Sequence, residues 1–241
     1  MKCKQFLKYL FFLVLMVSLG FLYGFSSHRN QQKKIKTIVV EFEEDERIFL
    51  SDSMVNKLLI QNSATVKNQA KSVINLYELE NRVSKNSYVE KASVFLTIEG
   101  ALKSIIKQRV PVARIILNTT SYYIDKEGVK IPLSANFSAR VPLITGLKSD
   151  ENKEEIVGLM QIILADNFLQ KEIVGIHKLA NGEYQFSVRS GNYKIDFGKL
   201  TNIDVKFKKL KAFYNKTFLD KTIENYKTIT LKYHNQVVCT K

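Results

Sequence analysis

The side chains best suited to chemistry are few in this chain and lie far apart in the sequence. The three histidines are His28, His177 and His234, and the two cysteines are Cys3 and Cys239. None has a neighbour at the spacing of a metal site, and the sequence contains no glycine-rich phosphate loop, no G-x-S-x-G elbow and no C-x-x-C pair. Folding could still bring distant residues together, but the sequence favours a protein without catalytic activity, cofactor or metal.

Other reactive or charged residues fit structural roles better than catalytic ones. Asp196 and Asp204 lie at an expected strand end and an expected helix start, so they predict no catalytic pair. If the apolar run near the N-terminus spans a membrane, Cys3 and Cys239 lie on opposite sides of it and cannot form a disulfide. The chemistry that remains is recognition.

The net charge of +14 indicates an acidic partner or surface, which could be nucleic acid, anionic lipid or an acidic protein face. The lysines are spread over the whole chain, and this favours a generally solvated basic surface over one dedicated patch. With 241 residues, 45% hydrophobic and 25% charged, the chain can bury one or two modest cores.

The clearest recognition element lies near the C-terminus. Residues 228–233 alternate apolar and polar side chains and predict a strand at the edge of an open sheet, where unpaired N–H and C=O groups can accept a partner strand. Tyr233 and Lys232 would add selectivity, Lys232 by meeting an acidic partner segment. A tyrosine in this place more commonly packs its ring on a neighbouring helix, so both roles stay open. The candidate partner-binding residues are Thr230, Leu231, Lys232, Tyr233, His234, Asn235, Val237 and Val238.

The front of the chain predicts a membrane anchor. Residues 9–27 carry no charge, and a helix of that length reaches roughly 28 Å, close to the hydrocarbon thickness of a bilayer. A cleaved signal peptide is the alternative, but the apolar run is long for one, and Gly24 with Ser26 makes a poor cleavage site. The anchor residues are Tyr9, Leu10, Phe11, Phe12, Leu13, Val14, Leu15, Met16, Phe21, Leu22 and Tyr23.

Charge does not decide the orientation of this anchor, because lysines precede it and basic residues also follow it. Residues 28–34 form a polar spacer whose basic side chains can meet anionic headgroups.

Residues 35–109 predict a first globular domain with the order strand, helix, helix, strand, strand. A strand covers 35–42, Ser51 caps a short helix, and a second helix follows a polar stretch. Two strands of a hairpin then turn at Gly100, where the backbone needs positive φ. The hairpin residues predicted to face the core are Ala92, Val94, Leu96, Ile98, Leu102, Ser104 and Ile106.

Pro111 cannot donate a backbone hydrogen bond, so we place a domain boundary there, with a second domain over 110–241. Its short strands, at 114–117, 122–124, 129–133, 141–145, 185–189, 193–197 and 228–233, predict an antiparallel meander. Two helices interrupt it. The helix at 152–165 is acidic at its start, and the helix at 203–218 is predicted to pack Ile203, Phe207, Leu210, Tyr214 and Phe218 on the sheet and to leave its lysines in water.

Four segments in order carry a family resemblance. NSYVEKA at 86–92 and KQRVPVAR at 107–114 look like the exit of the POTRA domain in the FtsQ/DivIB cell-division family. YYIDKEGV at 122–129 and RVPLITG at 140–146 are similar to the start of that family's β domain. The chain lacks tryptophan and ends soon after Val238, which departs from better-known members.

The resemblance implies the fold class α+β: a single transmembrane helix, a POTRA domain, then a mostly antiparallel β domain with two helices. It implies a cytoplasmic tail at 1–8, an outer domain in the periplasm, and a place in the inner membrane at the division septum. The implied function is a non-enzymatic divisome scaffold that binds FtsB and FtsL, with other division proteins bound through the POTRA domain, and neither nucleic acid nor a small-molecule substrate. Tyr233 matches a tyrosine near the start of the family's FtsB-binding strand.

Two other functions stay open. A POTRA-bearing periplasmic chaperone or transport component is the alternative, although such proteins usually carry several POTRA units or lead into a membrane barrel. A cytosol-facing nucleic-acid binder is a third, indicated by charge alone.

Overall fold

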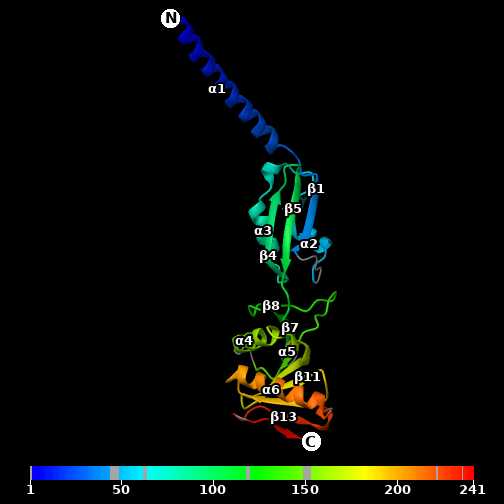
Figure 1. Ribbon diagram of the computed structural model, residues 1–241. Coiled ribbons are helices and arrows are strands. Elements are labelled where there is room, and N and C mark those ends of the chain that lie inside the picture. The colour runs from blue at the N-terminus through cyan, green and yellow to red at the C-terminus, as the bar shows by residue number, and fades with distance from the viewer. Residues whose placement is uncertain are drawn as a thin grey trace. The chain divides into compact units, whose positions relative to one another are not determined.

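The computed structural model describes residues 2–43, 49–61, 64–117, 120–148, 153–220, 222–234 and 236–241. The chain divides into two compact units, Met1–Gln108 and Arg109–Lys241. Figure 1 labels the α-helices and some of the strands. An apolar N-terminal helix followed by mixed helices and sheets confirms the predicted α+β class.

The first element, α1 (Lys2–Gln31), is one continuous helix of 30 residues. Its segment Lys8–Gln31 is apolar and long enough to cross a bilayer, and no other helix among the described residues meets that test. A signal sequence would have the same composition. All of the predicted anchor side chains from Tyr9 to Tyr23 are exposed in the folded chain, as a lipid-facing helix requires.

The first unit continues with a small sheet and its helices. In chain order the elements are β1 (Thr37–Phe42), α2 (Asp52–Leu58), β2 (Ile60–Gln61), β3 (Ala64–Thr65), η2 (Lys71–Val73), α3 (Leu76–Ser84), β4 (Val89–Leu96) and β5 (Ala101–Gln108). The sheet order is β1-β5-β4, with β1 parallel and β4 antiparallel to β5. Figure 1 shows these three long strands side by side. The predicted order of strand, helix, helix, strand, strand is present, interrupted by the short β2–β3 pair.

Local signals explain where these helices begin. Ser51 accepts a hydrogen bond from the Met54 N–H at 3.4 Å, and Asn75 accepts one from the Glu78 N–H at 3.1 Å. The core between the helices and the sheet is apolar. Its buried members are Ile35, Leu50, Val55, Leu59, Val66, Leu79, Val83, Val89, Val94, Leu102 and Ile106.

The hairpin corrects one prediction. Ile98 was expected on the core face, but β4 ends at Leu96 and the Ile98 side chain is 89% exposed. The Gly100 N–H donates to the Thr97 carbonyl at 3.2 Å, so the turn begins earlier than the alternation indicates. Gly100 has φ of +95°, as predicted.

The second unit contains a nine-stranded sheet and three α-helices among its described residues. Its elements are β6 (Ala113–Leu117), β7 (Thr120–Ile124), β8 (Lys130–Ile131), β9 (Leu143–Thr145), α4 (Lys153–Leu164), α5 (Asn167–Glu172), β10 (Ile173–Lys178), β11 (Tyr184–Val188), β12 (Lys194–Gly198), α6 (Ile203–Leu219), η4 (Ile223–Asn225), β13 (Thr228–Thr230) and β14 (Val238–Thr240). The sheet order is β14-β13-β12-β11-β10-β9-β6-β7-β8.

This sheet is not the simple meander that was predicted. Most neighbouring strands are antiparallel, but β9 pairs parallel with both β6 and β10, and β13 pairs parallel with β12. Parallel pairs need crossovers, and α4–α5 and α6 provide them between their flanking strands. The sequence interpretation missed α5 and β10. Asp166 marks the start of α5, because its side chain accepts the N–H groups of Phe168 and Leu169.

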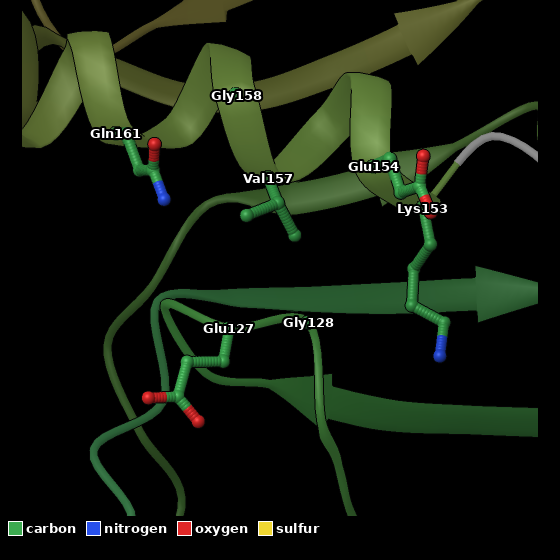
Figure 2. A pocket seen from close by; sticks show the side chains of 7 residues that line it. All are labelled: Glu127, Gly128, Lys153, Glu154, Val157, Gly158 and Gln161. Carbon is green, nitrogen blue, oxygen red and sulfur yellow. The ribbon is translucent and has the colours of Figure 1, made fainter.

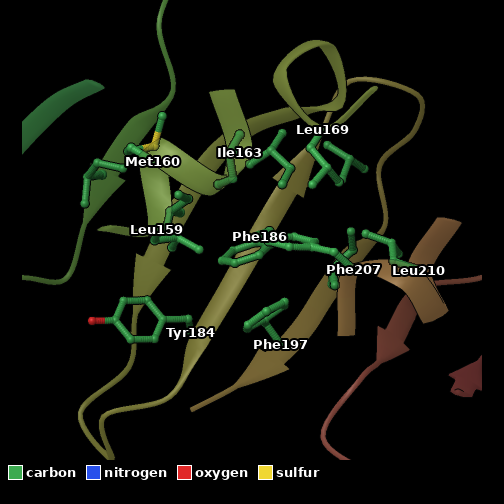
Figure 3. Packing of buried hydrophobic residues seen from close by; sticks show 14 of the residues in the cluster. Leu159, Met160, Ile163, Leu169, Tyr184, Phe186, Phe197, Phe207 and Leu210 are labelled. Carbon is green, nitrogen blue, oxygen red and sulfur yellow. The ribbon is translucent and has the colours of Figure 1, made fainter. Parts of the chain in front are cut away.

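The core of the second unit lies between the sheet and these helices. Figure 3 shows Leu159, Met160 and Ile163 of α4 approaching Tyr184 and Phe186 of β11. Residues of α5 and α6, among them Leu169, Phe207 and Leu210, fill the rest of this core.

One prediction for the helices lies outside the described residues, and two predictions for α6 change. The acidic residues Asp150 and Glu151 and the expected first residue Asn152 lie outside the described residues. In α6, Phe207, Leu210 and Tyr214 are buried as predicted, but Phe218 is 42% exposed. Lys206 was placed in water, yet it is buried.

Candidate partner-binding edge

The C-terminal strands end the nine-stranded sheet, but not in the order that the sequence indicated. The predicted edge strand at 228–233 is shorter, and it lies second from the edge as β13 (Thr228–Thr230). The edge itself is β14 (Val238–Thr240), which pairs with β13 on one side only. The sequence interpretation placed Val237 and Val238 after a short break in a single edge segment, and it did not recognise the second strand that begins at Val238.

The register places β14 side chains on two faces. Ile229 is paired with Cys239, and Thr230 with Val238. Ile229 is buried and Cys239 packs partly against the same core, where burial raises the pKa of its thiol. Val238, 38% exposed, lies on the opposite face of the sheet, so the edge presents an apolar side chain to solvent.

The residues between β13 and β14 divide into buried and exposed positions. Leu231 is buried in the core, so its predicted role as a partner contact changes to a structural one. Tyr233 is 51% exposed and His234 is also exposed. Asn235 lies outside the described residues. Tyr233 therefore remains available as a side-chain contact for a docked strand.

Lys232 differs from its prediction as a contact for an acidic partner. Its ammonium group lies 2.6 Å from Glu183 Oε2 and 2.9 Å from Asp196 Oδ2, so it is already paired within the chain. The hydrogen bond from Lys232 lowers the pKa of Glu183, and the hydrogen bonds from Glu183 and Asp196 raise the pKa of Lys232. This triad holds the residues after β13 against β11 and β12.

Lys209 of α6 fixes the same segment from another direction. Its ammonium group donates to the carbonyls of Leu231, at 3.3 Å, of Tyr233, and of His234, at 3.3 Å. A cation that meets three carbonyl oxygens fixes the backbone without specifying a side chain. Lys209 therefore fixes the backbone of residues 231–234, which follow β13.

Gly198 at the end of β12 is a further positioning residue. Its φ is +73°, and a Cβ atom there would lie 2.8 Å from Lys232 Cγ. The sequence showed the glycine but not its neighbour, because the contact joins residues far apart in the chain. Lys209, Glu183 and Asp196 were missed for the same reason.

A buried carboxyl group and two buried tyrosines of the second unit form hydrogen bonds with one another. Buried Glu172 accepts hydrogen bonds from Ser190 and from the Tyr214 hydroxyl, the latter at 3.1 Å. The Tyr193 hydroxyl donates to Tyr214 at 2.8 Å, and burial raises the pKa of both tyrosines. Such phenols stay protonated at neutral pH, so this network acts as an internal brace for α5 and α6.

A cavity in the second unit lies between α4 and the turn before β8, and it carries mixed charge. Figure 2 shows Glu127 and Gly128 facing Lys153, Val157 and Gln161. The cavity measures about 620 Å³. Its described lining residues include no histidine, cysteine or serine.

His177 makes a hydrogen bond within the sheet of the second unit. His177 Nδ1 lies 2.8 Å from Thr145 Oγ1, a hydrogen bond across the β9–β10 pair. Within the described parts of the chain, no group of three histidine, cysteine, aspartate or glutamate side chains could hold a metal ion.

One comparison with known proteins finds a match. Residues 110–240 match the family model described as FtsQ/DivIB, C-terminal related. The match covers more than half of the chain and includes every strand from β6 to β14. No curated protein matches the chain.

Proposed function

The chain belongs to the family FtsQ/DivIB, C-terminal related, and on this premise we propose that it is a non-enzymatic scaffold of the bacterial divisome whose β14 edge binds an FtsB-like strand. The observation that carries the proposal is the position of β14 at the end of the sheet. Among the described residues it pairs with β13 alone, so the backbone groups of its other side can meet a partner strand. FtsL would join through the same complex. In this proposal the first unit is a POTRA domain that contacts other division proteins.

Backbone pairing would supply most of the affinity at β14, because the exposed side chains there are few. Tyr233 and Val238 are the apolar contacts beside the edge. Lys209 and Lys232 hold the segment in place, so they would act by positioning and not by touching the partner. The apolar helix α1 anchors the scaffold, with the tail inside, the globular units in the periplasm and the protein at the septum.

Site-specific photocrosslinking tests the docking edge. A photoreactive residue at Thr240, exposed on β14, should crosslink to an FtsB-like partner in cells. The matched control carries the same residue at Lys130, exposed on β8 at the opposite edge of the sheet. Equal crosslinking at the two edges, or crosslinking at Lys130 alone, would contradict docking at β14.

Truncation of the side-chain contact gives a second test. Tyr233→Ala should weaken partner binding by about 2 kcal/mol if the ring is a buried anchor in the complex. Tyr77→Ala is the control, because Tyr77 is an exposed tyrosine of the first unit. Calorimetric titration with the partner's soluble domain measures the difference. Unchanged affinity for Tyr233→Ala would exclude the tyrosine ring as an anchor and leave the backbone and Val238 as the determinants of binding.

A further inference from the structure

The end of the first unit that adjoins α1 exposes apolar side chains beside basic ones. Ile98, in the turn between β4 and β5, is 89% exposed, and Val73 at the end of η2 is 63% exposed. A β-branched side chain at the tip of a turn is exposed at a hydrophobic cost, and the fold covers neither residue. Lys33 and Lys34 precede β1 and are also exposed.

Hydrogen bonds hold these segments together as one surface. The Lys71 N–H donates to the Lys33 carbonyl at 3.0 Å, and Lys71 Nζ donates to the Thr97 carbonyl at 3.2 Å. The Lys36 N–H donates to the Gly100 carbonyl at 3.0 Å. Residues 33–36, 71–73 and 97–100 therefore form a continuous surface, which we name the membrane-proximal tip.

The chain between α1 and this surface is too short to let the tip move far from the bilayer. The helix ends at Gln31, and Ile35 is already fixed in the core, where its N–H donates to the Gln69 carbonyl at 2.9 Å. Four Cα steps reach at most about 14 Å. A spanning α1 thus keeps the tip within reach of the lipid headgroups in any orientation of the unit.

The charge of the tip fits an anionic surface. Lys33, Lys34, Lys36 and Lys71 supply four positive charges, and Glu99 beside Ile98 supplies one negative charge. Cations near an anionic leaflet gain attraction from its surface potential, and apolar side chains among them gain from entering the headgroup boundary. A protein partner that bound the same residues would have to fit between the first unit and the membrane, so the bilayer itself is the favoured surface.

We propose that the membrane-proximal tip docks on the bilayer, with Ile98 and Val73 inserted at the headgroup boundary and the lysines on anionic lipid headgroups. The inference depends on α1 as the anchor and not on partner docking at β14. The contact would limit the tilt of the first unit about its short tether. A failure of this proposal would leave the proposed divisome function untouched.

Depth measurements on the full chain in vesicles test the docking. A fluorophore attached through Ile98→Cys, in a chain carrying Cys3→Ser and Cys239→Ala, is quenched by lipids labelled near the glycerol. The same fluorophore at Ser87→Cys is the control. Ser87 is exposed just before the start of β4, and the eight residues of that strand, which span roughly 26 Å, separate it from the turn that holds Ile98. Matching thermal unfolding with the parent chain would confirm that each labelled protein is folded.

Docking predicts stronger quenching at position 98 than at position 87. The difference should grow when phosphatidylglycerol is added to phosphatidylcholine vesicles. Lys33→Gln and Lys34→Gln should each lower the ratio of docked to undocked protein by about fivefold in the anionic vesicles. Equal quenching at the two positions would overturn the proposal, as would a position-98 signal that ignores both the anionic lipid and the lysine substitutions.

Discussion

Three lysines of the second unit and two lysines of the membrane-proximal tip, Lys33 and Lys34, have opposite surroundings. In the second unit, Lys206 and Lys209 donate to backbone carbonyls and Lys232 pairs with two carboxylates. At the tip, Lys33 and Lys34 are exposed to solvent beside exposed apolar side chains. The same residue type therefore stabilises the fold in one region and can meet an external surface in the other. A net charge of +14 cannot distinguish these uses.

The largest effect on stability should come from the buried lysine. Lys206 Nζ donates to the carbonyls of Phe197, at 3.0 Å, and Lys199, at 2.6 Å. Lys206→Met keeps the aliphatic volume but leaves both acceptors without this donor, and should cost about 1–3 kcal/mol of unfolding free energy. Lys208→Met on the exposed side of α6 is the control. Urea unfolding measures both, and equal values would mean that Lys206 only fills space.

Burial also lowers the pKa of Lys206, with neighbouring Lys209 acting in the same direction. A depressed lysine pKa means that the charged form is less favoured in the fold than in the unfolded chain. Lys206 Nζ also lies 4.8 Å from the centroid of the Phe197 ring, so the Lys206→Met comparison measures the loss of the two carbonyl hydrogen bonds together with this cation–π contact.

A smaller loss is expected where the lysine network meets the backbone. Gly198→Ala places a Cβ atom against Lys232 and forces a non-glycine residue to φ of +73°. The strain should cost on the order of 1 kcal/mol. Gly182→Ala is the matched control, since Gly182 has φ of +79° with no atom near the added Cβ. The excess loss at Gly198 over Gly182 isolates the contact with Lys232, and no excess would show that Lys232 moves freely.

Features that depend on neighbouring residues could be predicted from the sequence, whereas contacts between residues far apart in the chain could not. Local periodicity located α1, the hairpin turn at Gly100 and the apolar face of α6. It could not place Ile98, because a turn that starts two residues early reverses the environment of one side chain. It could not find the Lys232 triad, since Glu183 and Asp196 meet Lys232 only when β11 and β12 lie side by side.

The candidate partner-binding edge was also predicted only in part. A strand near residue 230 was visible in the alternation of side chains, but the sequence left open whether Tyr233 packs on a helix or is exposed. The second strand β14 was not, because three residues carry too little pattern to identify a strand. Parallel pairing of β13 with β12 depends on the crossover through α6, which no local signal specifies.

The effect of Lys232 on stability should depend on pH in one direction. The ion pair depresses the pKa of Glu183, so its contribution is present above the unfolded pKa of about 4.5 and is lost as pH falls through the lower folded pKa. The raised pKa of Lys232 extends the contribution to alkaline pH. Lys232→Met should therefore lower Tm at pH 7 and approach wild type in acid. A gap that persists once neither Glu183 nor Asp196 carries a charge would assign the loss to packing.

The smallest expected effect completes the comparison between the two groups of lysines. The double variant Lys33→Gln, Lys34→Gln should unfold within about 0.5 kcal/mol of wild type in detergent, because both side chains are exposed and the hydrogen bond that joins this segment to Lys71 uses the backbone carbonyl of Lys33. Thermal unfolding of the purified full chain measures it, with Lys206→Met as the destabilised reference. The variant thus removes charge without removing structure. A loss as large as that of Lys206→Met would show that these lysines support the fold after all, and the distinction between structural and surface lysines would then fail at the membrane-proximal tip.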